Sequence, residues 1–175
     1  MPKSFLKGID RSGLARGLFH NLRFDEEGNI RPDFVLNRTD MHGTRMLIVG
    51  PNFGCGSSRE HAVWGMLQFG IRAIIGTSFA GIFADNAANN GLLLVTLPEG
   101  QIATLMAYVE RELTDITVDL ERRVIKAETL ELSFEISELR RRALMLGLDR
   151  IGETLTHASA IQAFQKKHLA AQPWL

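Results

Sequence analysis

Three short apolar runs in the middle of the chain predict buried strands of a parallel sheet. They lie at about 45–50, 72–76 and 92–97. Two segments with helical spacing separate them, one opening at Ser57 and ending before Gly70, the other covering about 79–89 and ending at Gly91. Short helical crossovers between apolar strands make a βαβαβ core with right-handed connections, so the pattern predicts an α/β fold.

The flanks of this core have a different pattern. The first 40 residues are rich in glycine and predict loops and short extended pieces, with an exposed turn at 25–29. Beyond Pro98 the predicted elements are a helix to about 113, a hairpin of 117–120 and 123–126 joined by two residues, a strand at 130–134, and helices at 137–146 and 151–169. Without a repeat or a linker in the sequence, we expect one domain over residues 1–175 with a C-terminal helical part.

Composition narrows the functional classes. Twenty basic and twenty acidic residues give a net charge of zero, which argues against a nucleic-acid partner. Because the chain has neither a bilayer-length apolar run nor a signal-peptide pattern, we expect a cytoplasmic protein without a membrane partner. The one cysteine, Cys55, cannot form an internal disulfide, and the five histidines lack metal-binding spacing, so no metal site is expected.

The segment with the clearest chemistry follows the first predicted strand. It runs Asn-Phe-Gly-Cys-Gly-Ser-Ser-Arg-Glu-His over 52–61. Its glycines allow close backbone approach, and Ser57 and Ser58 are predicted to lie at a helix start, where backbone N–H groups favour an anion. Arg59 adds a planar donor pair that matches a carboxylate. The pattern therefore indicates an anion pocket, although a capped helix with glycines for turn geometry explains the same residues equally well.

Standard phosphate motifs do not fit this segment. A P-loop needs lysine before Ser or Thr, and the loop has none. A dinucleotide fingerprint needs a third glycine where Arg59 stands. A nucleophilic pair of Cys55 and His61 is a weaker alternative, since a lone cysteine is usually buried and inert.

The eight residues Gly54–His61 resemble the swivelling domain of the aconitase superfamily, and most closely the small subunits of bacterial 3-isopropylmalate dehydratases. The similarity extends over Phe69–Ile75, Ser78–Ala80, Ile82–Phe83, Asn90–Leu93, Pro32–Asn37 and Gly147–Gly152. It implies an aconitase-type swivelling β/β/α domain and a hydro-lyase that interconverts 2- and 3-isopropylmalate by removing and re-adding water.

The resemblance also implies partners and residue roles. The [4Fe–4S] cluster belongs to a large subunit, and the single cysteine here agrees with that division. No cofactor is expected on this chain, and the substrate is a small dicarboxylate. Ser57 corresponds to the catalytic serine, Ser58 and Arg59 to substrate contacts, and the supporting loop comprises Gly54, Cys55, Gly56 and His61.

A second segment, at 11–21, matches the family less closely. Arg16 fits an arginine that clamps a substrate carboxylate, while Arg11 and Ser12 lie where the family has a substrate-selecting loop. The alternative for both arginines is a solvated surface loop. Members of the family also carry a strand before the match at Pro2, which is missing here before Met1; we expect this to open a sheet edge and favour association between copies.

Two other functions fit the same residues. The first is the same chemistry on another small diacid, such as citraconate or dimethylmaleate. The second is a carboxylate-binding module without catalysis, which would need no cluster-bearing partner.

Overall fold

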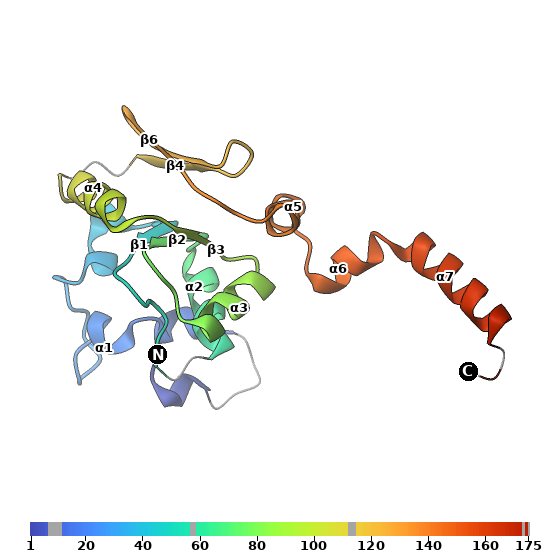
Figure 1. The fold of residues 1–175 in the computed structure, drawn as a ribbon. Coiled ribbons are helices and arrows are strands. Elements are labelled where there is room, and N and C mark those ends of the chain that lie inside the picture. Colours follow the sequence, from blue (N-terminus) through green and yellow to red (C-terminus); the bar gives the residue numbers. More distant parts are fainter. Residues whose placement is uncertain (7–11, 57–58, 112–114, 173, 175) are drawn as a thin grey trace.

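The computed structural model describes residues 1–6, 12–56, 59–111, 115–172 and 174. Its centre is a three-stranded parallel sheet in the order β1-β2-β3, formed by Met46–Ile48, Ala73–Gly76 and Leu93–Thr96. The crossovers are α2 (Glu60–Phe69) and α3 (Gly81–Asn89). The predicted βαβαβ core is therefore confirmed (Figure 1).

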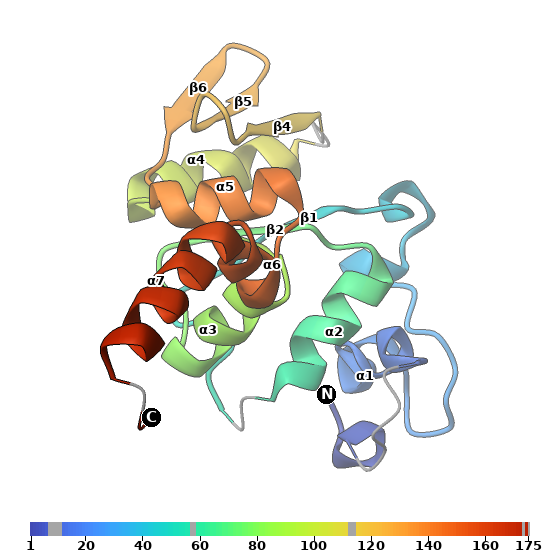
Figure 2. The same cartoon turned by 90° about the vertical axis from the view of Figure 1, so that its right-hand side faces the viewer.

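Alternation along β2 and β3 divides the core between the two faces of this sheet. Ile74 and Leu94 pack with α2 and α3. Ala73 and Val95 point to the opposite face, which is covered by α4 (Glu99–Glu110) and a second, antiparallel sheet (Figure 2). Successive side chains of a strand point to opposite faces, so these continuous apolar runs are buried on both sides.

The second sheet contains the predicted hairpin and third strand. Its strands are β4 (Ile116–Asp119), β5 (Val124–Ala127) and β6 (Leu130–Ser133), in the order β4-β5-β6. The hairpin connection has four residues and not two, because Asp119 pairs with Val124. The Asp119 carboxylate accepts a hydrogen bond from the Arg122 backbone at 2.8 Å, and Arg123 adopts a positive φ of 58°, which together widen the turn.

The described residues before β1 form short turns beside the sheet. They comprise the 3₁₀ turns η1 (Lys3–Leu6), η2 (Leu14–Gly17), η3 (Val35–Asn37) and η4 (Thr39–Met41), and the one-turn helix α1 (His20–Arg23). The exposed turn at 25–29 is confirmed, since Phe24 and Ile30 form an antiparallel bridge across it. A cavity of about 560 Å³ lies between this region, α4 and β1. Among the described residues, β1 pairs only with β2, so it forms an edge of the sheet.

The C-terminal part begins with α5 (Glu138–Leu146), which Ser137 caps by accepting a hydrogen bond from the Arg140 backbone. The predicted single helix at 151–169 is wrong: α6 (Arg150–Leu155) and α7 (Ala158–Ala171) are separate. A break at Thr156 and His157 divides them, and the Thr156 hydroxyl donates to the Glu153 carbonyl at the end of α6. Beyond α5 the chain extends away from the rest of the protein (Figure 1).

Candidate functional site

The loop that follows β1 is fixed against the loop that follows β2. The Phe53 N–H donates to the Ser78 carbonyl at 3.1 Å, and the Ala80 N–H donates to the Phe53 carbonyl at 2.9 Å. The Asn52 N–H donates to the Ser78 hydroxyl at 2.7 Å. Parallel pairing thus continues past the ends of both strands and holds the motif at the carboxyl edge of the sheet, where α/β folds place their ligand sites.

Gly54 is required by both its conformation and its surroundings. Its φ is 83°, and a Cβ built on it would lie 2.3 Å from Cγ of Phe83 in α3. Gly56 has a φ of 107°, but no described residue beyond its chain neighbours has an atom within 4 Å of a Cβ built on it. Gly54 therefore serves close packing against Phe83, whereas Gly56 serves only the backbone conformation.

Helix α2 begins three residues later than the sequence suggests. It starts at Glu60, with Arg59 as an extended N-cap residue that makes no side-chain capping hydrogen bond. The prediction that Ser57 opens the helix is therefore wrong. Ser57 and Ser58 themselves lie outside the described residues.

A partly buried hydrogen-bond network that the sequence did not reveal fixes the start of α2 to the end of α3. The Asn90 side-chain amide donates to the Glu60 carboxylate at 2.7 Å and to the Asn86 carbonyl at 2.8 Å. Its oxygen accepts from the Trp64 indole at 2.8 Å. The Trp64 ring also packs at a tilt against His61, with centroids 4.8 Å apart and an interplanar angle of 52°. Asn90 thereby positions the first turn of α2, which directly follows the motif loop.

Asn90→Ala is expected to lower the free energy of unfolding by about 1–3 kcal/mol, since it removes this partner from three partly buried polar groups, the Glu60 carboxylate, the Asn86 carbonyl and the Trp64 indole. Asn89→Ala is a matched control, because Asn89 is exposed at the last position of α3. Its effect should stay within about 0.5 kcal/mol. Denaturant unfolding measures both, and equal losses in the two variants would contradict a role for the network.

The second segment singled out in the sequence packs directly on α2. Leu14 and Leu18 are buried there, and the Leu14 N–H donates to the Gln68 side chain at 2.8 Å. Gly65 makes this crossing close, since a Cβ on it would lie 3.0 Å from the Leu14 carbonyl oxygen. Two regions that are about fifty residues apart in sequence therefore form one wall.

The arginines of this segment have unequal surroundings. Arg16 and Ser12 are exposed, and Arg11 lies outside the described residues. Arg23, which the sequence did not single out, donates to the Ala15 carbonyl at 3.0 Å and lies over the Phe69 ring. Partial burial lowers the pKa of the Arg23 guanidinium from its ordinary value. Arg23 therefore links the backbone of this segment to the end of α2.

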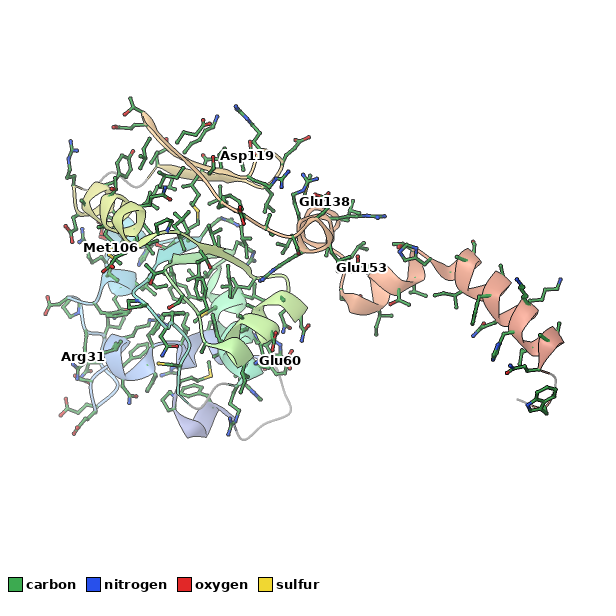
Figure 3. The ribbon with its side chains drawn as sticks, viewed as in Figure 1. Arg31, Glu60, Met106, Asp119, Glu138 and Glu153 are labelled. Atoms are coloured by element: carbon green, nitrogen blue, oxygen red, sulfur yellow. The ribbon has the colours of Figure 1, made fainter. Side chains whose placement is uncertain are left out.

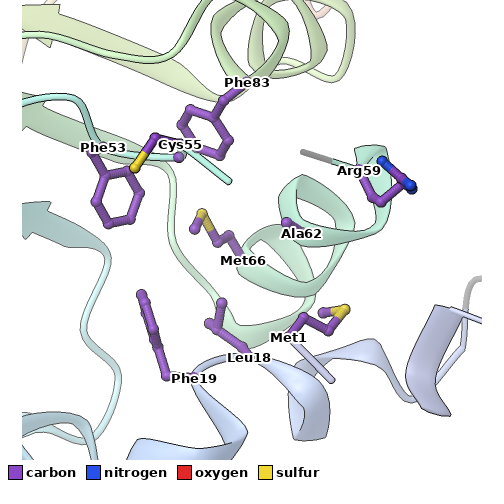
Figure 4. A pocket seen from close by; sticks show the side chains of 10 residues that line it. Met1, Leu18, Phe19, Phe53, Cys55, Arg59, Ala62, Met66 and Phe83 are labelled. Atoms are coloured by element: carbon purple, nitrogen blue, oxygen red, sulfur yellow. The ribbon is translucent and has the colours of Figure 1, made fainter. Parts of the chain in front are cut away.

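A cavity of about 370 Å³ lies where the motif loop, α2, α3 and the N-terminal segment meet. Its lining is Met1, Leu18, Phe19, Phe53, Gly54, Cys55, Arg59, Ala62, Met66 and Phe83. Cys55 and Phe53 lie on one side, Arg59 lies on the other, and Met66 and Ala62 lie between them (Figure 4).

Three of the predicted site residues line this cavity: Gly54, Cys55 and Arg59. Among the described residues, Ser12, Arg16, Gly56 and His61 do not line it. The sequence missed the apolar wall, which comes mainly from Leu18, Phe19, Phe53, Met66 and Phe83. Their apolar character was visible, but only the fold brings them together.

The cavity combines one cationic side chain at its rim with an apolar interior. Arg59 is exposed, and a guanidinium there can form paired hydrogen bonds to a carboxylate. The aromatic and aliphatic wall favours a branched hydrocarbon group over a second charge. The geometry thus suits a small molecule that carries a carboxylate and an apolar substituent.

Neither a metal-binding cluster nor a membrane-spanning helix is formed by the described residues. Within them, no group of three or more His, Cys, Asp and Glu side chains could hold a metal ion. Of the helices they form, none is both long and apolar enough to cross a bilayer.

Comparisons with known proteins extend over the whole chain. Residues 1–100 match the family described as the aconitase C-terminal domain, and residues 151–175 match the C-terminal domain of the 3-isopropylmalate dehydratase small subunit. The chain is 49% identical to the 3-isopropylmalate dehydratase small subunit 1 of Mannheimia succiniciproducens, covering all of this chain and 87% of that protein. It is 47% identical to the 3-isopropylmalate dehydratase small subunit of Phenylobacterium zucineum, with the same coverage.

A solved structure supports the same relationship. The structure of 3-isopropylmalate dehydratase from Methanocaldococcus jannaschii matches with a TM-score of 0.62 and 27% identity. The match covers 94% of this chain and 88% of that one.

Proposed function

The chain belongs to the family of 3-isopropylmalate dehydratase small subunits, and on that basis we propose that it isomerises 2-isopropylmalate to 3-isopropylmalate together with a large subunit, in leucine biosynthesis. The reaction is a dehydration followed by a rehydration, which makes the enzyme a hydro-lyase.

The observation that carries this proposal is the composition of the cavity beside the motif loop. It has Arg59 at its rim and an apolar wall that includes Leu18, Phe19 and Phe53. Isopropylmalate has carboxylates for a guanidinium and a branched isopropyl group for such a wall. A pocket built for citraconate would need less apolar surface, because that diacid carries a single methyl group.

The proposed roles follow the order of the chemistry. Ser57 removes the proton from the carbon next to a carboxylate and holds it, while the hydroxyl leaves the neighbouring carbon as hydroxide, giving an unsaturated diacid. Hydroxide then adds to the carbon that lost the proton, and Ser57 returns its proton to the carbon that lost the hydroxyl. Ser58 and Arg59 hold the carboxylate during both steps, with Arg16, Arg11 and Ser12 as further contacts once the partner is bound.

A serine hydroxyl needs strong assistance to act as a base near neutral pH. Each pKa unit corresponds to about 1.36 kcal/mol, whereas a helix terminus supplies only about 0.3–2 kcal/mol. Oriented loop amides, Arg59 and the exclusion of water by a second subunit must supply the remainder, so this chain alone should be nearly inactive.

Iron–sulfur chemistry belongs to the other subunit in this proposal. The chain has one cysteine, which cannot provide the set of thiolates that holds a [4Fe–4S] cluster. When bound, such a cluster supplies Lewis-acid assistance to the departing hydroxyl. The residues of this chain contribute the base and part of the carboxylate cage.

The proposed function can be tested by mixing the chain with a cluster-loaded large subunit under anaerobic conditions. The absorbance of the unsaturated intermediate is followed with 2-isopropylmalate, citraconate and dimethylmaleate as substrates. We expect turnover only when both subunits are present, and the highest kcat/KM for isopropylmalate. Faster turnover of another diacid would contradict the proposed substrate, and binding of diacids without any turnover would indicate a binding module.

Arg59→Lys is expected to reduce kcat/KM of the reconstituted enzyme by about tenfold or more, because lysine keeps the charge but loses the paired hydrogen bonds. Arg142→Lys serves as the control, since Arg142 is exposed on α5. The kinetics of the control should be unchanged. If Arg59→Lys also has wild-type kinetics, Arg59 does not contact the substrate.

A further inference from the structure

Exposed apolar side chains are concentrated at the C-terminal end of the chain. Of thirteen large apolar side chains exposed in the described residues, nine lie at or beyond Leu139. We define the C-terminal arm as residues 150–172 and 174, which comprise α6, α7 and Trp174. The arm alone carries six of them: Ile151, Leu155, Ile161, Phe164, Leu169 and Trp174. Scattered exposed apolar residues are normal, but such a concentration marks an interaction surface.

The arm has little contact with the rest of the protein. It extends away from the body, and its side chains radiate outward beyond Glu153 (Figure 3). None of the residues of α7 is buried. Where α5, α6 and α7 meet, a shallow hollow of about 430 Å³ is lined by Leu139, His157 and Ile161, with Glu153 and Thr154.

The arrangement of side chains on α7 is that of a helix that packs on one face. Ile161, Phe164 and His168 follow the i, i+3, i+7 spacing of a single stripe, while Gln162 and Lys166 lie on the opposite side. Phe164 is 67% exposed. A fourteen-residue helix is only marginally stable in water by itself, so burial of this stripe would stabilise it.

The charges of the arm indicate the character of its partner. Between 154 and 172 the chain contains Lys166 and Lys167, with His157 and His168, and no acidic residue. An apolar groove with an acidic rim would complement this surface. Two α7 helices paired with each other would instead bring four lysines and no carboxylate into one short interface, which disfavours a second copy as the occupant.

We propose that the C-terminal arm docks in an apolar, acid-rimmed groove of the large subunit and provides most of the affinity between the two chains. The inference rests on the proposed function, because it takes the large subunit as the partner. The segment 151–175 also matches a domain described for small subunits, which agrees with a role specific to them. The arm acts as an anchor, while the cavity beside Arg59 carries the chemistry.

The test compares Phe164→Asp with Gln162→Asp in the full chain. Both variants place the same acidic residue on α7, but on opposite faces, so they share its effect on helix propensity and net charge. Binding to the immobilised large subunit is measured by biolayer interferometry. We expect Phe164→Asp to weaken binding at least about 30-fold, as for a buried aromatic anchor, and Gln162→Asp to stay within about threefold.

Turnover and self-association distinguish the remaining outcomes. At saturating concentrations of this chain, the Phe164→Asp enzyme should keep wild-type kcat, because the arm lies away from the cavity. Equal binding by both variants would overturn the proposal while leaving the proposed function intact. A dimer of this chain, seen by light scattering and lost only in Phe164→Asp, with unchanged binding to the large subunit, would also overturn it. If the wild-type chain does not bind the large subunit, the proposed function fails first.

Discussion

Ser57→Ala is expected to lower kcat of the reconstituted enzyme by about 10²–10⁴-fold, the usual contribution of a positioned acid or base. The variant keeps the backbone of the motif loop and removes only the hydroxyl that we propose to take the substrate proton. Because the substrate carboxylate is held by other groups, KM should change much less than kcat. Anaerobic turnover of 2-isopropylmalate measures both constants.

Ser58→Ala is the matched comparison, since the same atom is removed one position along the chain. It should raise KM more than it lowers kcat, as expected for a carboxylate contact. Exchange of the substrate proton with deuterated solvent gives an independent measure, and it should disappear in Ser57→Ala alone. Near-normal turnover in Ser57→Ala would exclude Ser57 as the base.

The buried strands were the most predictable part of the fold. β2 is buried at all four positions and β3 at three, so each appears in the sequence as a continuous apolar run. Strands that are covered on both faces are apolar at nearly every position. Such a run can be recognised without knowing which elements cover it. Gly70 and Gly91 also marked the ends of the preceding helices, because glycine readily adopts the positive φ that ends a helix. Their φ angles are 113° and 73°.

Two helix boundaries were mispredicted, the start of α2 and the break between α6 and α7. Ser57 and Ser58 are favourable N-cap residues, yet α2 starts after Arg59, which makes no side-chain cap. Arg59 has extended backbone angles, with φ of −136° and ψ of 143°, and the first turn that follows it is bonded through the Glu60 carboxylate to Asn90 at the end of α3. The break at Thr156 has no glycine or proline to announce it, so periodicity alone predicted one continuous helix.

The motif of the candidate site was predictable, but its surroundings were not. Gly54, Cys55 and Arg59 are close together in sequence and line the cavity together. Leu18 and Phe83 reach the same cavity from segments on either side of the motif, and nothing in their local sequence distinguishes them from core residues. Cavity residues that are far apart in the sequence can be identified only once the fold is known.

Gly54→Ala is expected to lower the free energy of unfolding by about 2–5 kcal/mol. About 1–2 kcal/mol comes from placing a side chain at a φ of 83°, and a further 1–3 kcal/mol from overpacking. The added Cβ would lie 2.3 Å from Cγ and 2.6 Å from Cβ of Phe83, which are the least movable atoms of that side chain. Denaturant unfolding of the chain measures the loss.

Two further variants separate the causes of this loss. Gly56→Ala meets the same conformational restriction at a φ of 107°, but among the described residues no atom beyond its chain neighbours lies within 4 Å of the new Cβ, so it should show the strain without the overpacking. Combining Gly54→Ala with Phe83→Ala, which removes the clashing Cγ and Cδ1 atoms, should recover part of the loss, giving a favourable coupling of at least about 0.5 kcal/mol in a double-mutant cycle. If Gly54→Ala and Gly56→Ala lose equal stability and the cycle shows no coupling, the motif loop does not depend on close packing against Phe83. The position of Cys55 and the adjoining edge of the cavity would then be fixed by hydrogen bonds, namely those of the motif loop to Ser78 and Ala80 and that of the Cys55 N–H to the Asn52 carbonyl.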